Sequence, residues 1–557
     1  MLDNYAIADN FSLLSKLMDI HGENSFKAKS FSSAAFTVEK LPLQLQTMPA
    51  EEISKIKGIG DSISKSIQEM LQTGRFSVLD THIEKTPPGI LEMLKIKGLG
   101  PKKIATIWKE LEIESLGELL YACNENRLTL LKGFGQKTQD AVAQSIEFYF
   151  SNQGRYLYAQ VEKLAFALEK QLQEELNTQV ALTGQFRRNE NIIDEIELVA
   201  ALPADALREK LQQVKALAPV ANAEDALLWE HEQHVKIRFY SAAADRFSQT
   251  LFTTTGDTTF LEHFSAVYDL SSLPAGITEE EIFSKAGMDY IEPCLRNGGL
   301  FIDLARKKTL PELITHKDIK GIIHSHSTWS DGERSLAEMA KAAKEQGYEY
   351  LVISDHSRSA FYANGLSIER IQAQHAEIDE LNKQLAPFRI FKSIEADILN
   401  DGSLDYPDEI LASFDLVIAS VHSNLKMSEE KAMSRLLKAI ENPYTTILGH
   451  MTGRLLLSRN GYPVNHQQII DACAANNVVI ELNAHPRRLD IDWQWIPYAL
   501  EKNVLLSVDP DAHSIEGFHD TYYGTLAARK GGLTASRNLS SFSAAELSAY
   551  ISKKRKN

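Results

Sequence analysis

The chain has 557 residues, a formal net charge of −16 at pH 7 and a hydrophobic content of 44%. This length accommodates three or four domains with substantial cores. No apolar stretch approaches the ~18–20 residues of a membrane span, and the first residues lack the basic and then apolar pattern of an export signal. We therefore expect a cytoplasmic protein with no membrane partner. Cys123, Cys294 and Cys473 are widely spaced, which fits a reducing compartment without disulfides.

The negative charge is distributed unevenly. Residues 1–150 hold 17 Lys and Arg against 19 Asp and Glu, so this part is near neutral and the remainder is strongly acidic. An acidic protein is an unusual nucleic-acid binder. Binding by the first 150 residues would depend on local amide geometry and a few lysines rather than on a broad basic face.

Three segments in this first part repeat one design. KIKGIGDSISKSI at 55–67, KIKGLGPKKIATI at 95–107 and LLKGFGQKTQDAV at 130–142 each place Gly-apolar-Gly between two predicted helices. The glycines permit a tight turn, and the exposed amides at the next helix N-terminus attract a phosphate. This spacing resembles the helix-hairpin-helix motif, which binds nucleic-acid backbones without reading sequence. The expected contact residues are Gly58, Gly60, Gly98, Gly100, Lys102, Lys103, Gly133 and Gly135.

The first of these segments, together with NSFKAKSFSSAA at 24–35, resembles the amino-terminal domain of family X DNA polymerases. Some members of that family use a lysine in the helix after the turn as a nucleophile on abasic sugar, because the step needs an amine. Ser66 aligns with that lysine here. Lys65 is one residue away, which a helix turns by about 100°, so we do not expect lyase activity.

The resemblance continues through residues 155–315. The segment TGQFRRNENIIDEIELVAA at 183–201 resembles the polymerase-beta-like palm signature, in which Gly-Ser-x-Arg-Arg holds the nucleotide and a following Asp-x-Asp holds two Mg²⁺. The residues of this degenerate nucleotide site are Gly184, Arg187, Arg188, Glu195 and Glu197.

The metal-binding part of the palm signature is altered. Glu195 and Glu197 stand where the two aspartates are usual, Gln185 replaces the phosphate-binding serine, and Lys236 aligns with the third acid. Glu is one methylene longer than Asp, and ~1 Å of misplacement in such a site can cost about 10²-fold in rate. A cation beside two divalent ions opposes them by roughly several kcal/mol per ion. We therefore expect a scaffold and DNA clamp with impaired or lost polymerase activity and a poor Mg²⁺ site, unless another carboxylate such as Asp194 restores metal binding.

Nine side chains that can bind metals recur in the last part of the chain, each at the end of an apolar run typical of a buried strand. They are His324, His326, Asp331, His356, Glu395, His422, His450, Asp511 and His513. Helix-like stretches follow the runs, as at 335–346 and 429–440, and this alternation favours a parallel β/α barrel. The C-terminal strand ends of such barrels converge on one mouth. Imidazole and carboxylate together suit Zn²⁺, Mn²⁺ or Fe²⁺, and Glu395 can bridge two ions.

The ordered set HxH…DG, SDH, a lone Glu, VHS, GH and DxH resembles the polymerase-and-histidinol-phosphatase (PHP) family of metal-dependent phosphoesterases, whose fold is a distorted seven-stranded β/α barrel with up to three metal ions. The resemblance implies one ion on His324, His326, Glu395 and Asp511, a second on Asp331, His356 and His513, and a third on Glu395, His422 and His450. Clustered ions can activate a water and clamp a phosphate. The implied catalytic residues are Asp331, as a metal ligand, and Arg454 and Arg488, as phosphate anchors.

From residue 1 to about 535 the chain resembles bacterial and archaeal family X DNA polymerases that carry a C-terminal PHP domain. The implied fold class is multidomain α/β: a helical helix-hairpin-helix part, a polymerase-beta-like α+β palm and thumb, and a distorted (β/α)7 barrel. The expected domains are a helical domain at 1–80, fingers at 81–150, palm at 151–240, thumb and linker at 241–317, and the barrel at 318–557.

The resemblance implies a DNA-repair protein that removes nucleotides from 3′ ends through two to three divalent ions. We expect Mn²⁺, with Zn²⁺ or Fe²⁺ as alternatives, and gapped, nicked or 3′-ended DNA bound without regard to sequence; the sequence does not identify protein partners. The same centre would serve 3′-phosphatase or abasic-site nicking activity.

Three alternatives stay open. The altered palm could still support gap-filling synthesis, or the protein could be a non-catalytic DNA-binding module whose metals are structural. A small-molecule phosphatase would leave the helix-hairpin-helix repeats unexplained.

Overall fold

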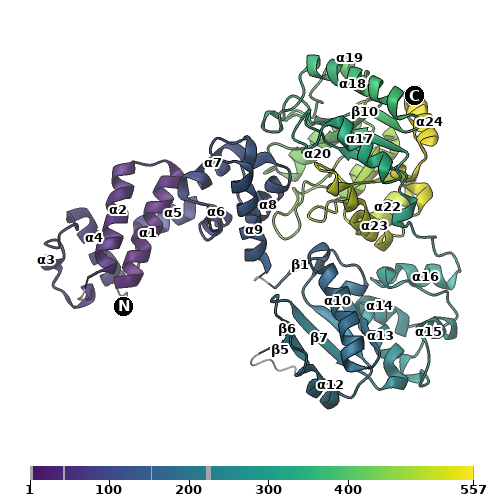
Figure 1. Cartoon of the computed structure of the whole chain (residues 1–557), viewed down its shortest axis with the longest axis horizontal. Coiled ribbons are helices and arrows are strands. Elements are labelled where there is room, and N and C mark those ends of the chain that lie inside the picture. The colour runs from purple at the N-terminus through teal and green to yellow at the C-terminus, as the bar shows by residue number, and fades with distance from the viewer. Residues whose placement is uncertain (1–3, 42–43, 152–153, 221–226, 556–557) are drawn as a thin grey trace. The chain divides into compact units, whose positions relative to one another are not determined.

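The computed structural model describes residues 4–41, 44–151, 154–220 and 227–555, and the chain divides into two compact units, residues 1–147 and 148–557 (Figure 1). The described part of the first unit is helical, and the second holds a mixed sheet, a group of helices and a parallel barrel. This confirms the predicted fold class. The finer domain limits stay predictions. None of the helices in the described ranges combines the length and apolar character that a membrane crossing requires.

The first unit is built around α1 (Asn4–His21), which packs against α2 (Ser25–Glu39), α5 (Ser77–Lys85) and α7 (Pro101–Leu111). Asn24 caps α2, because its side chain accepts hydrogen bonds from two amides of the first turn. The rings of Phe11, Phe31 and Phe76 meet in the core with centroids 5.5 to 6.1 Å apart. The other helices are α3 (Ala50–Ile53), α4 (Asp61–Thr73), α6 (Pro88–Met93), α8 (Leu116–Asn124) and α9 (Gln136–Ser151).

The second unit begins with a five-stranded mixed sheet in the order β2-β4-β7-β6-β5, in which only β4 and β7 run parallel. Its core contains Leu168, Phe186, Trp229 and Phe239. The strands are β2 (Val180–Leu182), β4 (Ile196–Ala200), β5 (Leu217–Pro219), β6 (Leu228–His231) and β7 (Lys236–Ser241), and the flanking helices are α10 (Tyr158–Leu176), α11 (Gly184–Arg187) and α12 (Ala204–Leu211).

A group of helices with its own aromatic core follows the mixed sheet. Phe252, Phe260, Phe264 and Phe283 are fully buried there. The helices are α13 (Phe247–Thr255), α14 (Thr258–Ser265), α15 (Glu279–Lys285) and α16 (Leu300–Arg306).

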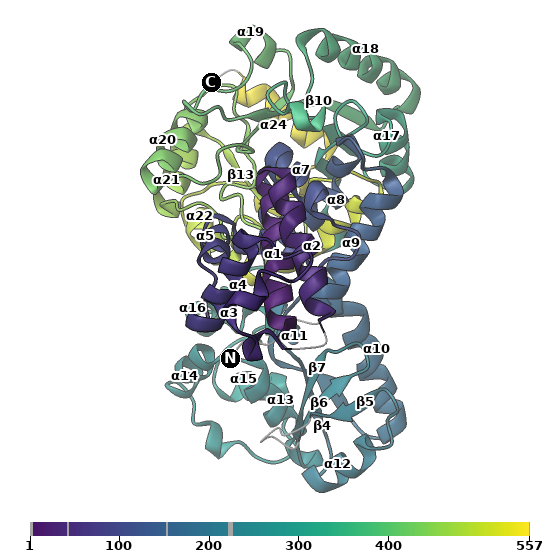
Figure 2. The same ribbon diagram turned by 90° about the vertical axis from the view of Figure 1, so that its left-hand side faces the viewer.

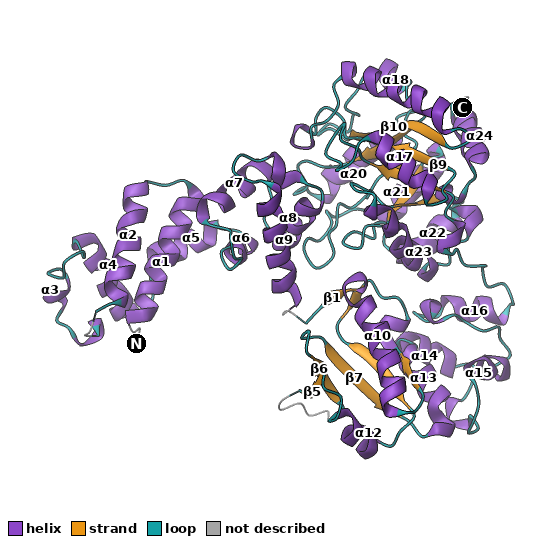
Figure 3. Cartoon of the chain, in the orientation of Figure 1, coloured by secondary structure: helices purple, strands orange, loops and turns teal. Residues whose placement is uncertain are grey.

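Seven parallel strands in chain order form the barrel (Figure 3). They are β8 (Gly321–Ser325), β9 (Tyr350–Ile353), β10 (Arg389–Asp397), β11 (Leu416–Ser420), β12 (Ile447–Leu448), β13 (Val479–Asn483) and β14 (Leu506–Asp509). The strands are almost continuously buried, as parallel strands covered on both faces are. A parallel bridge between Ser325 and Ala512 brings the first and last strands together, so the barrel is nearly closed.

Helices cover the outside of the barrel. In Figure 2, α17 (Leu336–Glu345) and α18 (Ile368–Leu385) lie on one side, and α20 (Glu429–Ile440) and α21 (His466–Asn476) on the other. Each begins at a Ser or Asn side chain that accepts an amide hydrogen bond, which fixes where the helix starts. The remaining helices are α19 (Asp408–Leu411), α22 (Ile496–Glu501), α23 (Asp520–Lys530) and α24 (Ala544–Lys554).

Candidate metal centre and nucleic-acid contacts

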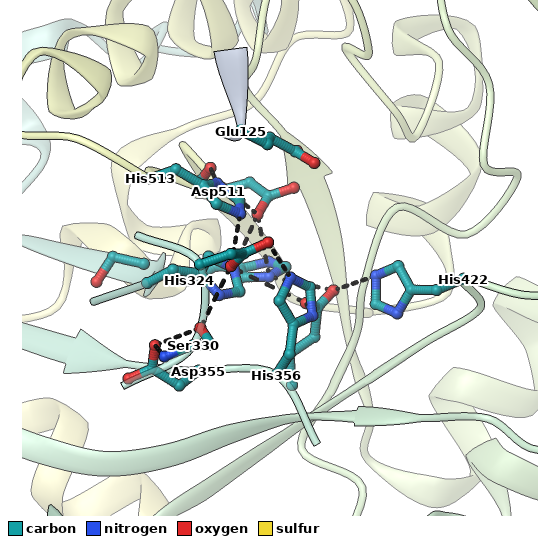
Figure 4. A network of polar contacts seen from close by, with 12 residues as sticks. Glu125, His324, Ser330, Asp355, His356, His422, Asp511 and His513 are labelled. Atoms are coloured by element: carbon teal, nitrogen blue, oxygen red, sulfur yellow. Dashed lines mark hydrogen bonds and ion pairs between the residues drawn. The ribbon is translucent and has the colours of Figure 1, made fainter. Parts of the chain in front are cut away.

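The C-terminal ends of the barrel strands bring together the nine side chains that the sequence marked as metal ligands. All are buried or nearly so. Figure 4 shows His324, His356, His422, Asp511 and His513 turned toward a common centre. Because each strand ends at the same mouth, ligands spread over almost 190 residues become neighbours.

Glu395 occupies the middle of this cluster. Its Oε1 lies 3.3 Å from His324 Nε2, 3.1 Å from His422 Nε2 and 3.0 Å from His450 Nε2. Its Oε2 lies 2.9 Å from His356 Nδ1. One carboxylate therefore faces four imidazoles from different strands, which is the arrangement of a bridging ligand.

The ligand atoms form three overlapping groups, each within 4.8 Å. One contains His324, His326 and Asp511; another contains His326, Asp331, His356 and His513; the last contains His356, Glu395 and His422. The grouping resembles the sets that the family resemblance implied, with four differences. His326 also reaches the second group and His356 the third, while Glu395 is absent from the first group and His450 from the third. The assignment of individual ligands to ions stays a prediction.

Two ligands adopt a backbone conformation that is uncommon outside glycine. The φ angles of His324 and Asp511 are +58° and +54°. Such conformations cost free energy and gather at functional sites, where the fold holds them in place. Here they turn both side chains toward Glu395 and His326.

The electrostatics favour positive charge at this centre. Burial opposes ionisation of Glu395, but His422, His324 and His356 hold its pKa well below the ordinary value. Burial likewise opposes protonation of His422, yet Glu395 and Asp397 raise its pKa to about 10. A divalent cation would supply the charge that these carboxylates attract. Burial, with His513 and His356 nearby, lowers the pKa of His326 to about 3, so this imidazole is neutral and able to bind metal.

Several buried ligand atoms of the described residues lie close to other ligand atoms but form no hydrogen bond with them or with any other group. They include His324 Nε2, both ring nitrogens of His356, and Glu395 Oε2. Buried polar atoms are rarely left in this state without a ligand. The donor set of imidazole and carboxylate therefore fits divalent metal ions, whose identity the arrangement does not select.

A second set of carboxylates orients the histidines. Glu481 Oε1 lies 2.5 Å from His324 Nδ1, and its Oε2 accepts the His450 amide at 2.6 Å. Asp397 Oδ1 lies 2.5 Å from His422 Nδ1. These contacts place the imidazole proton on Nδ1 and leave Nε2 facing the centre, as the supporting residues of metal sites do.

Asp355 holds the loop that carries the first ligands. It accepts hydrogen bonds from the Ser327 amide at 2.8 Å, from Ser330 Oγ at 2.5 Å and from Gln374 Nε2 at 2.6 Å. Asn483 Nδ2 donates to Asp511 Oδ2 at 3.0 Å. Sequence analysis missed all these supporting residues, although Asp355 directly precedes a ligand.

The two arginines predicted to anchor phosphate have different surroundings. Arg488 is buried, with Nε 3.7 Å from Asp511 Oδ2, so it lies beside the metal cluster. Arg454 donates to Asp492 at 2.5 Å and to the carbonyl oxygens of Arg488 and Leu489, and thus supports the loop that carries Arg488. Phosphate anchoring by either arginine stays a prediction.

In the first unit, the three Gly-apolar-Gly segments form the same turn. The first glycine of each, Gly58, Gly98 and Gly133, has a φ between +91° and +96°. The second glycine of the first two segments immediately precedes α4 or α7 in an extended conformation. A Cβ on Gly60, Gly98, Gly100, Gly133 or Gly135 would meet nothing within 4 Å. These turns therefore present open backbone at helix starts, and Lys103 Nζ donates to the Gly98 carbonyl at 3.3 Å.

The carboxylates of the altered palm have internal partners. Glu195 forms an ion pair with Arg238. Glu197 accepts from the Gln185 amide at 2.9 Å and from the Tyr240 hydroxyl at 2.9 Å. The Glu197 carboxylate also fills the space where a Cβ on Gly184 would lie.

Lys236, the cation that the sequence predicted beside the palm metal site, is exposed. Arg238, two residues further along β7, forms the ion pair with Glu195 instead. Asp194, the alternative carboxylate, bonds Arg155 at 2.9 Å and Gln185 Nε2 at 2.8 Å. The palm acids are thus surrounded by donors from the protein itself.

The two palm arginines are bound in place. Arg187 forms an ion pair with the buried Glu279, which also pairs with the fully buried Arg296 at 2.5 Å. Arg188 donates to the Thr255 carbonyl at 2.7 Å. Its own carbonyl accepts from the fully buried Lys530 of the barrel at 3.1 Å, which ties the palm to α23.

The fold and the cluster of candidate metal ligands indicate the class of protein, and comparison with family models supports it. Residues 323–485 match the PHP domain model, residues 2–76 match a helix-hairpin-helix domain, and residues 90–146 match a SAM-like helix-hairpin-helix tandem. The chain thus joins DNA-binding helical domains to a phosphoesterase-type barrel.

Comparison with known proteins gives the family. The chain is 32% identical over 554 residues to the DNA polymerase/3′-5′ exonuclease PolX of Bacillus subtilis, with 96% of each chain covered. The chain is also 28% identical over 171 residues to a probable phosphatase of Caldanaerobacter subterraneus, which is 29% of this chain and 60% of the relative. A probable phosphatase of Acetivibrio thermocellus is 29% identical over 29% of this chain and 64% of the relative. The chain belongs to the PolX family of DNA-processing enzymes that carry a PHP domain.

Proposed function

We propose that this protein is a DNA-repair enzyme that hydrolyses DNA phosphoesters at the barrel metal centre, chiefly by removing nucleotides from 3′ ends. The observation that carries the proposal is Glu395, which lies within 3.3 Å of an imidazole nitrogen of each of four histidines in a buried cluster. A structural metal site is usually closed by four ligands, whereas eight further candidate ligands gathered with a shared carboxylate suit several ions with positions for water and phosphate.

The ions would be held by the three groups of ligands described above, with Mn²⁺ as the expected metal and Zn²⁺ or Fe²⁺ as alternatives. Bound ions of this kind acidify a water and stabilise the charge on a phosphate. The protein's contribution is to orient the imidazoles through Glu481 and Asp397. Arg488, buried beside Asp511, is placed to orient a phosphate oxygen with a guanidinium fork.

The helical unit would grip the DNA backbone. Its three turns offer amides at helix starts, and Lys102 and Lys103 add positive charge at the middle turn. Such contacts read phosphate rather than bases. Gapped, nicked and 3′-ended DNA of any sequence would therefore be suitable partners.

The palm would serve as a scaffold with impaired or lost polymerase activity. Two Mg²⁺ ions would have to displace Arg238 from Glu195 and the Gln185 amide from Glu197 before binding. Each displacement leaves a partly buried donor without its acceptor, which costs about 1–3 kcal/mol.

Gap-filling synthesis is the second candidate, because the Bacillus subtilis relative is named as both a DNA polymerase and a 3′-5′ exonuclease. One assay separates the candidates: the metal-free protein is given a primer–template with and without Mn²⁺ and nucleotides. Shortening of the primer supports the exonuclease, lengthening supports the polymerase, and a shift in a gel without either supports a binding module with structural metals.

A further inference from the structure

The loop between His356 and Leu366 borders the metal centre. It starts at the ligand His356 and returns to it, because the Leu366 amide donates to the His356 carbonyl at 2.9 Å. Asn364 Nδ2 lies 3.4 Å from the Trp329 carbonyl oxygen and 3.3 Å from that of Ser330. These residues directly precede the ligand Asp331, so the loop lies beside two parts of the cluster.

Neighbouring side chains hold the backbone of this loop. The Asp405 carboxylate accepts a hydrogen bond from the Ser359 backbone amide at 2.6 Å. The Tyr406 hydroxyl accepts one from the Arg358 backbone amide at 3.0 Å. Ala360 and Ala363 are both fully buried. These hydrogen bonds and buried alanines hold the loop in one conformation. The side chains on its solvent-facing surface therefore lie at a fixed position.

Phe361 stands on that outer surface with 83% of its area exposed. Burying a phenyl group is favourable, yet the loop buries the small alanines and leaves the large aromatic side chain in solvent. Single exposed aromatic residues are common on proteins, so the position is what matters here. Arg358 lies on the same loop with half of its side chain exposed, and its guanidinium is paired with Asp405 at 3.3 Å.

An exposed aromatic face on an ordered loop is one of the components from which proteins build sites for single-stranded nucleic acid, because every base can stack on it. Phe361 follows His356 by five residues, so its backbone lies within about 17 Å of that ligand even if the chain were fully extended. The hydrogen bond that closes the loop shortens this reach. If the terminal phosphate of a DNA strand were bound at the metal centre, the last bases of that strand would lie within this distance of His356.

We propose that Phe361 is a positioning residue that stacks on one of the last two bases of the DNA strand whose 3′ end is hydrolysed. The proposal rests on the proposed function and adds the form of the substrate: an unpaired 3′ end with its bases turned out of the duplex. Every base has a π face, so the contact tolerates any sequence. A rigid loop makes the contact without a cost of ordering.

Hydrolysis by the full chain tests the proposal on two single-stranded substrates, one intact and one without bases on its last two nucleotides. Phe361→Ala should lower kcat/KM about tenfold on the intact strand, or about 1.4 kcal/mol, and less than twofold on the baseless strand. Phe361→Trp should retain the wild-type rate and Phe361→Leu should not. The control, Leu300→Ala, removes an apolar side chain that is 50% exposed on α16 and should change neither rate. Equal losses on both substrates would overturn the proposal.

Fluorescence of 2-aminopurine at either of the last two positions tests the stacking without chemistry, with EDTA present to prevent hydrolysis. Wild-type protein should quench the fluorescence, and Phe361→Ala should abolish most of the quenching while Phe361→Trp preserves it. Unchanged quenching in Phe361→Ala would contradict the proposal. Quenching by wild-type protein that degrades no DNA with Mn²⁺ would instead contradict the proposed function and leave the stacking intact.

Discussion

Glu481→Gln is the sharpest probe of how the metal centre is organised. The two carboxylate oxygens of Glu481 each accept a hydrogen bond, one from His324 Nδ1 at 2.5 Å and the other from the His450 backbone amide at 2.6 Å. A glutamine of the same shape has one acceptor oxygen and turns an NH₂ group toward the other donor. One of the two metal-binding histidines therefore loses its support, and His324 also loses a negative neighbour that raises its basicity.

The expected loss follows from the role of such residues. Removing a partner that orients a metal-bound histidine costs about 10- to 100-fold in metal affinity or activity, which is about 1.4–2.7 kcal/mol. Titration of the metal-free protein with Mn²⁺, followed by calorimetry, should show this weakening. Asp397→Asn, which weakens the support of one ligand histidine, His422, should give a loss toward the lower end. Wild-type Mn²⁺ affinity in a folded Glu481→Gln protein would refute the reasoning.

The other predictions concern the grip on DNA and the palm. Gly100→Val should weaken binding to unrelated DNA sequences alike without unfolding the turn, because Gly100 has an extended backbone and open space around it. Gly98→Val would also strain a backbone φ of +91°. Unchanged affinity for gapped DNA after Gly100→Val would contradict the proposed contact. With its exonuclease silenced, the native palm should extend a primer very slowly or not at all. The triple change Glu195→Asp, Glu197→Asp and Arg238→Asp, which removes the cation that pairs with Glu195, should partly restore metal-dependent nucleotide binding, as measured by calorimetry. Robust extension by the native palm would make gap filling the leading function.

Patterns that repeat along the chain could be read from the sequence. The Gly-apolar-Gly segments predicted tight turns, and the positive φ of Gly58, Gly98 and Gly133 confirms that backbone. The alternation of apolar runs and helix-like stretches predicted the parallel barrel, which the strand order confirms. Both signals are local or periodic, so they can be recognised in the sequence without knowledge of the fold.

Contacts between distant residues could not be read in this way. Glu481 supports His324 across 157 positions, and nothing in its own strand distinguishes it from an ordinary buried acid. Arg454 is predicted to anchor a phosphate, and the sequence could not indicate that its neighbours in space are loop carbonyls and Asp492; the anchoring role stays a prediction. In the palm, side-chain direction decided that Arg238 rather than Lys236 pairs with Glu195, a distinction that an alignment of positions does not contain.

The central claim is that the barrel centre hydrolyses DNA, and the double change His324→Ala, His326→Ala tests it most directly. The measurement is degradation of a 3′-labelled and a 5′-labelled strand with Mn²⁺, by wild-type and doubly changed protein purified side by side. Degradation from the 3′ end should be lost while affinity for gapped DNA is kept, because the ligands and the helical turns lie in different units. If the doubly changed protein, in a preparation free of other nucleases, degraded DNA at the wild-type rate, hydrolysis at the barrel centre would be contradicted.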